Sequence, residues 1–195
     1  MQLSRLKNDR VAQAAVFALF VTIGVAGRWG QPDWCVTPLA AISLLAGCTL
    51  PLAAAVAVPL VAMAITDLAL APYDGWAVPI AVYAAMAAPA LMGRLLRRPA
   101  GSHVAGAARL ATLAAAPSAL FFITTNLAVW ASSSLYPATP AGLAECYAAA
   151  VPFLRRMLVG DLAWTAVTFA AAAAAGVYSL RAGATTSGQQ RTAAA

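Results

Sequence analysis

The sequence predicts an all-α fold, a polytopic membrane protein built as a bundle of six transmembrane helices, and two observations support this prediction. Hydrophobic residues make up 63% of the 195 residues and charged residues only 9%, whereas a soluble domain averages about 25% charged residues. A water-soluble chain of this size could not cover its surface with so few charges. The apolar residues also gather in long runs, and a spanning helix needs roughly 20 of them.

Six apolar runs are separated by charged or turn-rich segments, and each run is a candidate spanning helix. In chain order they cover residues 11–26, 36–48, 52–70, 76–96, 109–130 and 157–180. The second run is short, and Pro51 separates it from the third. Residues 141–154 form an apolar segment too short to span, so we expect it to lie at the membrane interface or to fold back.

The basic residues orient this bundle. With the N-terminus in the cytoplasm, nine of the twelve Lys and Arg residues fall on the cytoplasmic side: Arg5, Lys7, Arg10, Arg94, Arg97, Arg98, Arg109, Arg181 and Arg191. Cytoplasmic loops of membrane proteins carry such an excess. We therefore predict a multi-pass protein of the bacterial inner membrane with both termini in the cytoplasm. The net charge of +6 does not indicate a nucleic-acid partner, because the basic residues lie at the ends of apolar runs.

The chain divides into three parts on this interpretation. Residues 1–10 form an N-terminal cytoplasmic tail, residues 11–180 the six-helix transmembrane domain, and residues 181–195 a C-terminal cytoplasmic tail. The last part is rich in Gly, Thr, Gln and Ala, a composition typical of disorder. The lipid bilayer is thus the first predicted partner of the chain.

Polar and aromatic side chains gather near the outer ends of the predicted spans. An ionisable residue inside a bilayer costs several kcal/mol unless it is paired or hydrated, so such residues mark functional sites by default. The candidate ligand-binding residues are Arg28, Trp34, Asp67, Tyr73, Tyr83, Asn126, Trp130, Tyr147, Arg155, Arg156 and Asp161. They predict a pocket that opens outward, with aromatic walls and a few charges that orient a small molecule.

Structural explanations for the same residues stay open at this point. Trp and Tyr form belts at every membrane interface, and Arg28 could simply extend its charge into the interface. Arg155 or Arg156 could pair with Asp161 and tie two helices together. The sequence alone does not decide between these explanations and a binding site.

Enzymatic and metal-binding signatures are sparse. The single histidine, His103, lies in a basic loop predicted over residues 97–108. This position argues against a histidine metal site or a Ser-His-Asp triad in the bundle. The chain has no Gly-rich phosphate loop, so it does not hydrolyse nucleotides by that route. The three cysteines lack metal-site spacing, although Cys35 and Cys146 could form a disulfide if both face the periplasm. We expect no resident cofactor, no metal site and no enzymatic activity.

Several stretches carry a family resemblance. They are 36–41, 66–68, 124–130, 135–139 and 142–162, and the most specific elements are Asn-x-x-x-Trp from Asn126, Tyr-Pro-x-Thr from Tyr136 and Gly-Asp-Leu from Gly160. These stretches resemble a family of small bacterial membrane proteins of unknown function. The layout is also similar to the substrate-binding S components of energy-coupling-factor (ECF) transporters, and most of all to the cobalamin-transporter family BtuM.

This resemblance implies roles for particular residues. It places Asp67 and one of the two arginines at 155 and 156 in the ligand site, with Arg28 where that family carries a histidine. It also implies that Ala14 and Ala18, a pair of small residues one helical turn apart, pack on an ATP-driven energising module in the membrane. Residues 72–83 contain no cysteine that could bind cobalt, so cobalamin is one candidate ligand among several.

The sequence favours a substrate-binding membrane component for uptake of a vitamin-like small molecule from the outer side. Transport would need a separate ATP-driven module or a toppling motion of the whole bundle. Two alternatives stay open. One is a structural or assembly protein without a small-molecule ligand. The other is a membrane enzyme that uses the outer carboxylates Asp67 and Asp161.

Overall fold

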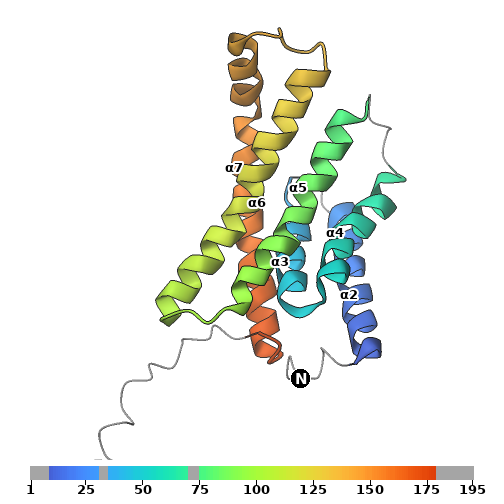
Figure 1. Cartoon of the computed structure of the whole chain (residues 1–195), viewed down its shortest axis with the longest axis vertical. Helices are drawn as coiled ribbons and strands as arrows, with labels where there is room; N and C mark the ends of the chain where they lie inside the picture. Colours follow the sequence, from blue (N-terminus) through green and yellow to red (C-terminus); the bar gives the residue numbers. More distant parts are fainter. Residues whose placement is uncertain (1–8, 31–34, 70–74, 179–195) are drawn as a thin grey trace, which may run out of the picture.

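A computed structural model describes residues 9–30, 35–69 and 75–178. Across these ranges the chain forms six α-helices and one 3-10 turn, with no strand. The helices are α2 (Arg10–Trp29), α3 (Leu39–Thr49), α4 (Leu52–Asp67), α5 (Ala77–Gly93), α6 (His103–Ser132) and α7 (Pro140–Ala174), and the turn η1 (Arg94–Arg97) extends α5 (Figure 1). The all-α prediction is confirmed. The predicted C-terminal tail, and the N-terminal tail up to residue 8, lie outside the described residues.

Four helices have the length and composition of transmembrane helices. They are α2, the segment Ala77–Arg97, α6 and α7. The other two are shorter: α3 has 11 residues and α4 has 16. At 1.5 Å per residue α3 is about 16 Å long, roughly half the thickness of a bilayer core. A helical membrane protein is therefore supported, and the count of six spans stays a prediction.

The short helix α3 occupies the centre of the bundle. All 11 of its residues are buried, and it contacts each of the five other α-helices. Glycines allow the closest of these contacts, because a Cβ atom at Gly47 would collide with the carbonyl of Ala90, and one at Gly93 with the carbonyl of Leu44. Small residues at such crossings let membrane helices pack without a hydrophobic driving force.

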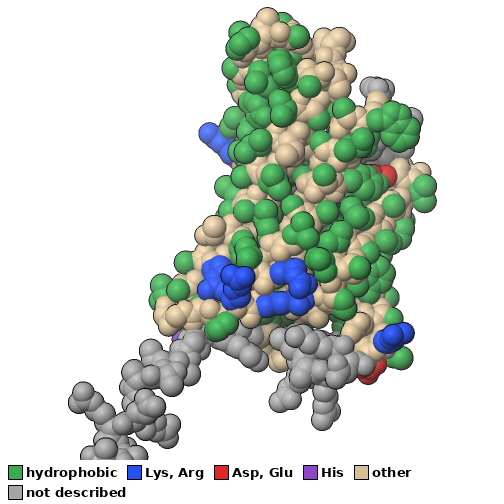
Figure 2. Space-filling model, viewed as in Figure 1, with side chains coloured by type: hydrophobic (Ala, Val, Ile, Leu, Met, Phe, Trp, Pro, Cys, Tyr) green, Lys and Arg blue, Asp and Glu red, His purple; other side chains and the backbone are tan. Residues whose placement is uncertain are grey.

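The end of the bundle that holds Arg94, Arg97, Arg98 and Arg109 is called here the basic end, and its arginines are visible near the lower edge of Figure 2. Arg97 donates from Nε to the Gly47 carbonyl at 2.9 Å and from Nη2 to the Leu50 carbonyl at 2.6 Å. These carbonyls lie at the C-terminus of α3, where the last carbonyls of a helix have no N–H donor within the helix, and Arg97 supplies that donor. Arg109 donates to the Arg98 carbonyl at 2.8 Å. Two of the basic residues thus also stabilise the fold.

Helix α7 joins two segments that the sequence predicted to be separate. Residues 141–154 are neither interfacial nor folded back, because one continuous helix runs over 35 residues from Pro140 to Ala174. The side chain of Thr139 caps its start by accepting from the Gly142 N–H at 3.1 Å. The sequence prediction separates the two segments at Arg155 and Arg156. A helix about 52 Å long exceeds the bilayer core, so charges near its middle can still reach an interface.

The basic loop is also shorter than expected. Helix α6 begins at His103 and not at Arg109, because the Ser102 hydroxyl accepts from the Ala105 N–H at 3.1 Å and caps the helix. Helices α6 and α7 run side by side and extend beyond α4 and α5 at the end opposite the basic end (Figure 1). Their projecting part is called here the α6–α7 hairpin, residues 119–153.

Candidate functional site

Three predicted ligand-binding residues meet at the end of the bundle opposite the basic end. Arg28 Nη1 lies 3.1 Å from Asp67 Oδ1, and the Tyr83 hydroxyl donates to Asp67 Oδ2 at 3.0 Å. The Arg28 and Asp67 side chains are only 12% and 14% exposed. Because the three residues come from α2, α4 and α5, the fold assembles them from distant parts of the sequence. They are called here the Asp67 cluster.

Helix ends position this cluster. Arg28 lies in the last turn of α2, where a cation is favoured by the helix dipole, and Asp67 is the last residue of α4. Because Gly27 has no side chain, Pro38 before α3 can pack closely against α2; a Cβ atom at Gly27 would collide with the Pro38 ring. The C-terminal ends of α2 and α4 thus bring Arg28 and Asp67 into contact.

The carboxylate of Asp67 retains an unused acceptor. Within the described part of the chain, no donor is aligned for a hydrogen bond on the buried Oδ1 atom, although Arg28 lies beside it. The contact between these two atoms is therefore ionic. A buried carboxylate oxygen ordinarily accepts at least one hydrogen bond. Oδ1 is thus the one carboxylate oxygen of the cluster without an aligned donor among the described residues.

Asp161 lies apart from this cluster and has a different partner. Ser118 on α6 donates to Asp161 Oδ2 at 2.5 Å, and the two residues are 0% and 7% exposed. The suggested pair between Asp161 and Arg155 or Arg156 is not formed. Both arginines are exposed in the middle of α7, and the Arg156 guanidinium carbon lies 5.1 Å from the centre of the Phe153 ring. Neither arginine contacts Asp67.

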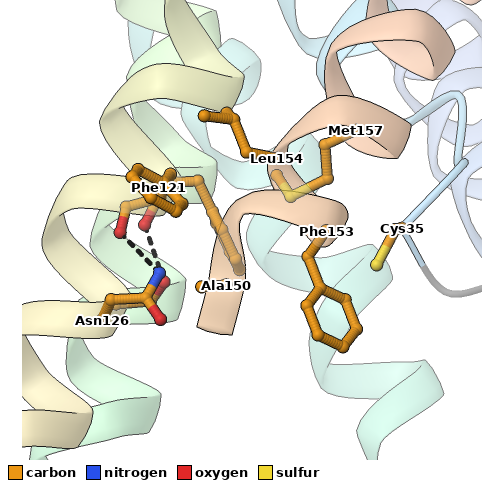
Figure 3. Close-up of a pocket in the computed structure, with 9 residues that line it drawn as sticks. Cys35, Phe121, Asn126, Ala150, Phe153, Leu154 and Met157 are labelled. Atoms are coloured by element: carbon orange, nitrogen blue, oxygen red, sulfur yellow. Dashed lines mark hydrogen bonds between the residues drawn. The ribbon is translucent and has the colours of Figure 1, made fainter. Parts of the chain in front are cut away.

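The predicted residues of the α6–α7 hairpin bond to its main chain. Asn126 Nδ2 donates to the Phe122 carbonyl at 2.7 Å (Figure 3). Trp130 Nε1 donates to the Pro137 carbonyl at 3.0 Å, and the Tyr147 hydroxyl to the Ile123 carbonyl at 2.8 Å. The bonds of Trp130 and Tyr147 fasten the turn and the two helices to each other, whereas the Asn126 bond stays within α6. They give the Asn-x-x-x-Trp and Tyr-Pro-x-Thr elements a structural role.

A small apolar cavity of about 160 Å³ lies between α6, α7 and the segment before α3. It is lined by Cys35, Phe121, Phe122, Thr125, Asn126, Ala150, Phe153, Leu154 and Met157 (Figure 3). Its volume is below the roughly 300–1,000 Å³ typical of small-molecule sites. Cys35 and Cys146 do not form the suggested disulfide with each other.

Sequence analysis missed most of the residues that line this cavity, because a Phe or Met within an apolar run carries no distinguishing signal. Ser118 was missed for the same reason, since Ser and Thr are common in membrane helices. The predicted aromatic residues Trp34 and Tyr73 lie outside the described residues. Ala14 and Ala18 are exposed on α2, so their surface is available to another helix.

Residues 8–183 match a family described as a family of unknown function, DUF6580. No curated protein and no solved structure matches the chain. Since the family match covers most of the 195 residues, the chain belongs to the DUF6580 family of unknown function.

Proposed function

We propose that this protein is a membrane-embedded substrate-binding component that takes up a small, vitamin-like molecule. The basic end faces the cytoplasm of the bacterial inner membrane, following the positive-inside rule. The ligand then enters from the periplasmic side, at the end that carries the Asp67 cluster. The unused acceptor on Asp67 is the single observation that carries this proposal.

The energetics of the Asp67 cluster favour a functional role. Removing two charges from water costs several kcal/mol per ion, and their mutual attraction often fails to offset this cost. Apolar residues would join α2, α4 and α5 at least as well. A cluster that places an arginine, a carboxylate and a phenol next to one another instead offers donors and acceptors to a ligand.

The cluster also suggests which chemical group it recognises. A carboxamide can donate an N–H to Asp67 Oδ1 and accept from the neighbouring guanidinium of Arg28. Amide-bearing molecules therefore fit the cluster better than purely anionic or purely cationic ones. Cobalamin, which carries peripheral carboxamides, stays one candidate; the 160 Å³ cavity between α6 and α7 is a separate place that none of Arg28, Asp67 and Tyr83 lines.

The coupling mechanism remains part of the proposal. In an S-component-like protein, the exposed face of α2 with Ala14 and Ala18 would pack on an ATP-driven membrane module. A solitary protein would instead move its ligand by toppling within the bilayer. Both mechanisms use the same binding site at the Asp67 cluster.

Native mass spectrometry tests the proposal on full-length protein purified in mild detergent. We expect a co-purified small molecule on the wild type, or binding of added cyanocobalamin or nicotinamide as amide-bearing probes. Asp67→Asn should lower the occupancy at least tenfold, since a hydrogen bond to a charged group contributes about 1.5–3 kcal/mol. Asp9→Asn is the matched control, because Asp9 caps α2 at the opposite end and Asn is an equally good cap.

Two outcomes would contradict the proposal. Equal occupancy in the wild type and in Asp67→Asn would remove the Asp67 cluster from the binding site. Failure to detect or load any small molecule would favour a structural or assembly protein. The hairpin bonds of Trp130 and Tyr147 already suit that second candidate, because they fasten helices without any ligand.

A further inference from the structure

A second polar site lies between α6 and α7, and it begins with a carboxylate that has no cationic partner. Asp161 is 7% exposed, and its one hydrogen-bond partner among the described residues is the fully buried hydroxyl of Ser118. No Lys, Arg or His within the described ranges contacts it. An isolated charge in a membrane protein costs several kcal/mol unless something neutralises it.

The hydroxyl of Thr165 suggests how the charge of Asp161 is neutralised. In the described helices seven Ser and Thr hydroxyls donate to the carbonyl four residues earlier, those of Ser43, Thr49, Thr66, Thr112, Thr124, Thr125 and Ser132. Thr165 is only 2% exposed, yet its Oγ1 atom has no partner in this part of the chain. It lies four residues after Asp161, so both side chains share one face of α7. This oxygen is left available for a ligand.

We propose that Ser118, Asp161 and Thr165 form a sodium-binding site inside the bundle. One carboxylate balances one monovalent charge, and hydroxyl oxygens are among the ligands that a hard cation prefers. A proton would need the carboxylate alone and would leave the Thr165 oxygen unused. This exchangeable site departs from the expectation of no metal site, which rested on the lack of histidine and cysteine patterns.

The surrounding charges do not offer an alternative partner. On α7 the nearest basic residue, Arg156, is five residues from Asp161 and about 140° around the helix. Helix α6 carries its titratable residues, His103 and Arg109, at the basic end, at least nine residues from Ser118. Helix α3 contributes Cys48, near its end at the basic end. Among the described residues, no basic side chain therefore balances the charge of Asp161.

The test uses full-length protein in detergent and does not depend on finding an organic ligand. The apparent melting temperature is followed by tryptophan fluorescence while sodium replaces choline at constant ionic strength and pH. We expect a rise of about 4 °C per tenfold increase in sodium above the dissociation constant, and a much smaller response to potassium. Binding of radioactive sodium gives the stoichiometry, with one ion expected per chain.

Variants separate ion binding from folding. Thr165→Val keeps the shape of the side chain and should raise the sodium dissociation constant about tenfold. Thr49→Val is the matched control, because its buried hydroxyl already donates to the Leu45 carbonyl; its sodium response should equal that of the wild type. Asp161→Asn should abolish the response.

Three results would overturn the inference. The first is a wild type whose stability and tracer binding are independent of sodium. The second is an unchanged sodium response in Thr165→Val. The third is stabilisation by lower pH that sodium neither reproduces nor competes with, which would show protonation of Asp161 alone. Because ligand occupancy is not measured, none of these results bears on uptake at the Asp67 cluster.

Discussion

Asp67 and Asp161 are both largely buried carboxylates in a bundle with few charges, yet their surroundings differ. Asp67 lies beside the guanidinium of Arg28 and accepts from the phenol of Tyr83. The only hydrogen-bond partner of Asp161 among the described residues is the neutral hydroxyl of Ser118. The first is neutralised by the protein itself. The second has to obtain its positive charge from elsewhere.

The difference shows that two kinds of polar site coexist in one apolar bundle. A permanent ion pair between helices keeps its charges and can recognise a polar ligand without changing its protonation state. A buried carboxylate whose hydrogen-bond partner is a neutral hydroxyl keeps a charge that no described residue balances, and this is the basis of the proposed sodium site. Mutations that remove one partner should therefore have very different consequences at the two sites.

Removal of Arg28 should have the largest effect on stability. In Arg28→Met, Asp67 would keep its burial and lose the cation beside it, and breaking a buried ion pair typically costs about 3–5 kcal/mol. We expect a loss of about 3 kcal/mol in the free energy of unfolding, measured by SDS titration in mixed micelles.

The double variant Arg28→Met, Asp67→Asn makes this prediction sharper. Without the carboxylate there is no uncompensated anion, so most of the lost stability should return. A double variant as unstable as Arg28→Met would show that Arg28 stabilises the bundle through packing and not through its charge.

The hydroxyl of Tyr83 should have an intermediate effect. Tyr83→Phe keeps the ring and removes one hydrogen bond to a charged group, which typically contributes about 1.5–3 kcal/mol. Since the cluster is partly exposed, we expect the lower end, about 1.5 kcal/mol, in the same SDS titration. Tyr147→Phe, whose hydroxyl donates to a main-chain carbonyl, is the comparison and should cost about 1 kcal/mol or less. An equal loss in both variants would mean that the Asp67 cluster contributes no charge-assisted hydrogen bond.

The sequence predicted some of these residues and not their partners. Asp67 and Arg28 were found because charges are rare in apolar runs and therefore conspicuous. Their pairing could not be predicted, because it depends on how α2 and α4 meet. Ser118 and Thr165 were missed, because their hydroxyls usually donate within their own helix and only the packed structure shows the exceptions.

The positions of most helices were predicted from the sequence, but one boundary between helices was not. Apolar runs located five of the six described helices to within a few residues, with the largest error at the start of α6. The two segments separated at Arg155 and Arg156 proved to be one helix, since the sequence did not show that α7 projects beyond its neighbours. Arg155 and Arg156 were assigned to a helix end and the ligand site for that reason.

The smallest stability effect is expected at Asp161, and it separates the two sites most clearly. Asn at this position can still accept from Ser118 and removes a charge that no basic side chain balances, so Asp161→Asn should change the free energy of unfolding by less than about 1 kcal/mol in sodium-free buffer. Asp67→Asn should cost more under the same conditions, because Arg28 then loses its anion. If Asp161→Asn were as destabilising as Asp67→Asn without sodium, Asp161 would have to be stabilised by a permanent cationic partner, and the contrast between the two carboxylates would not hold.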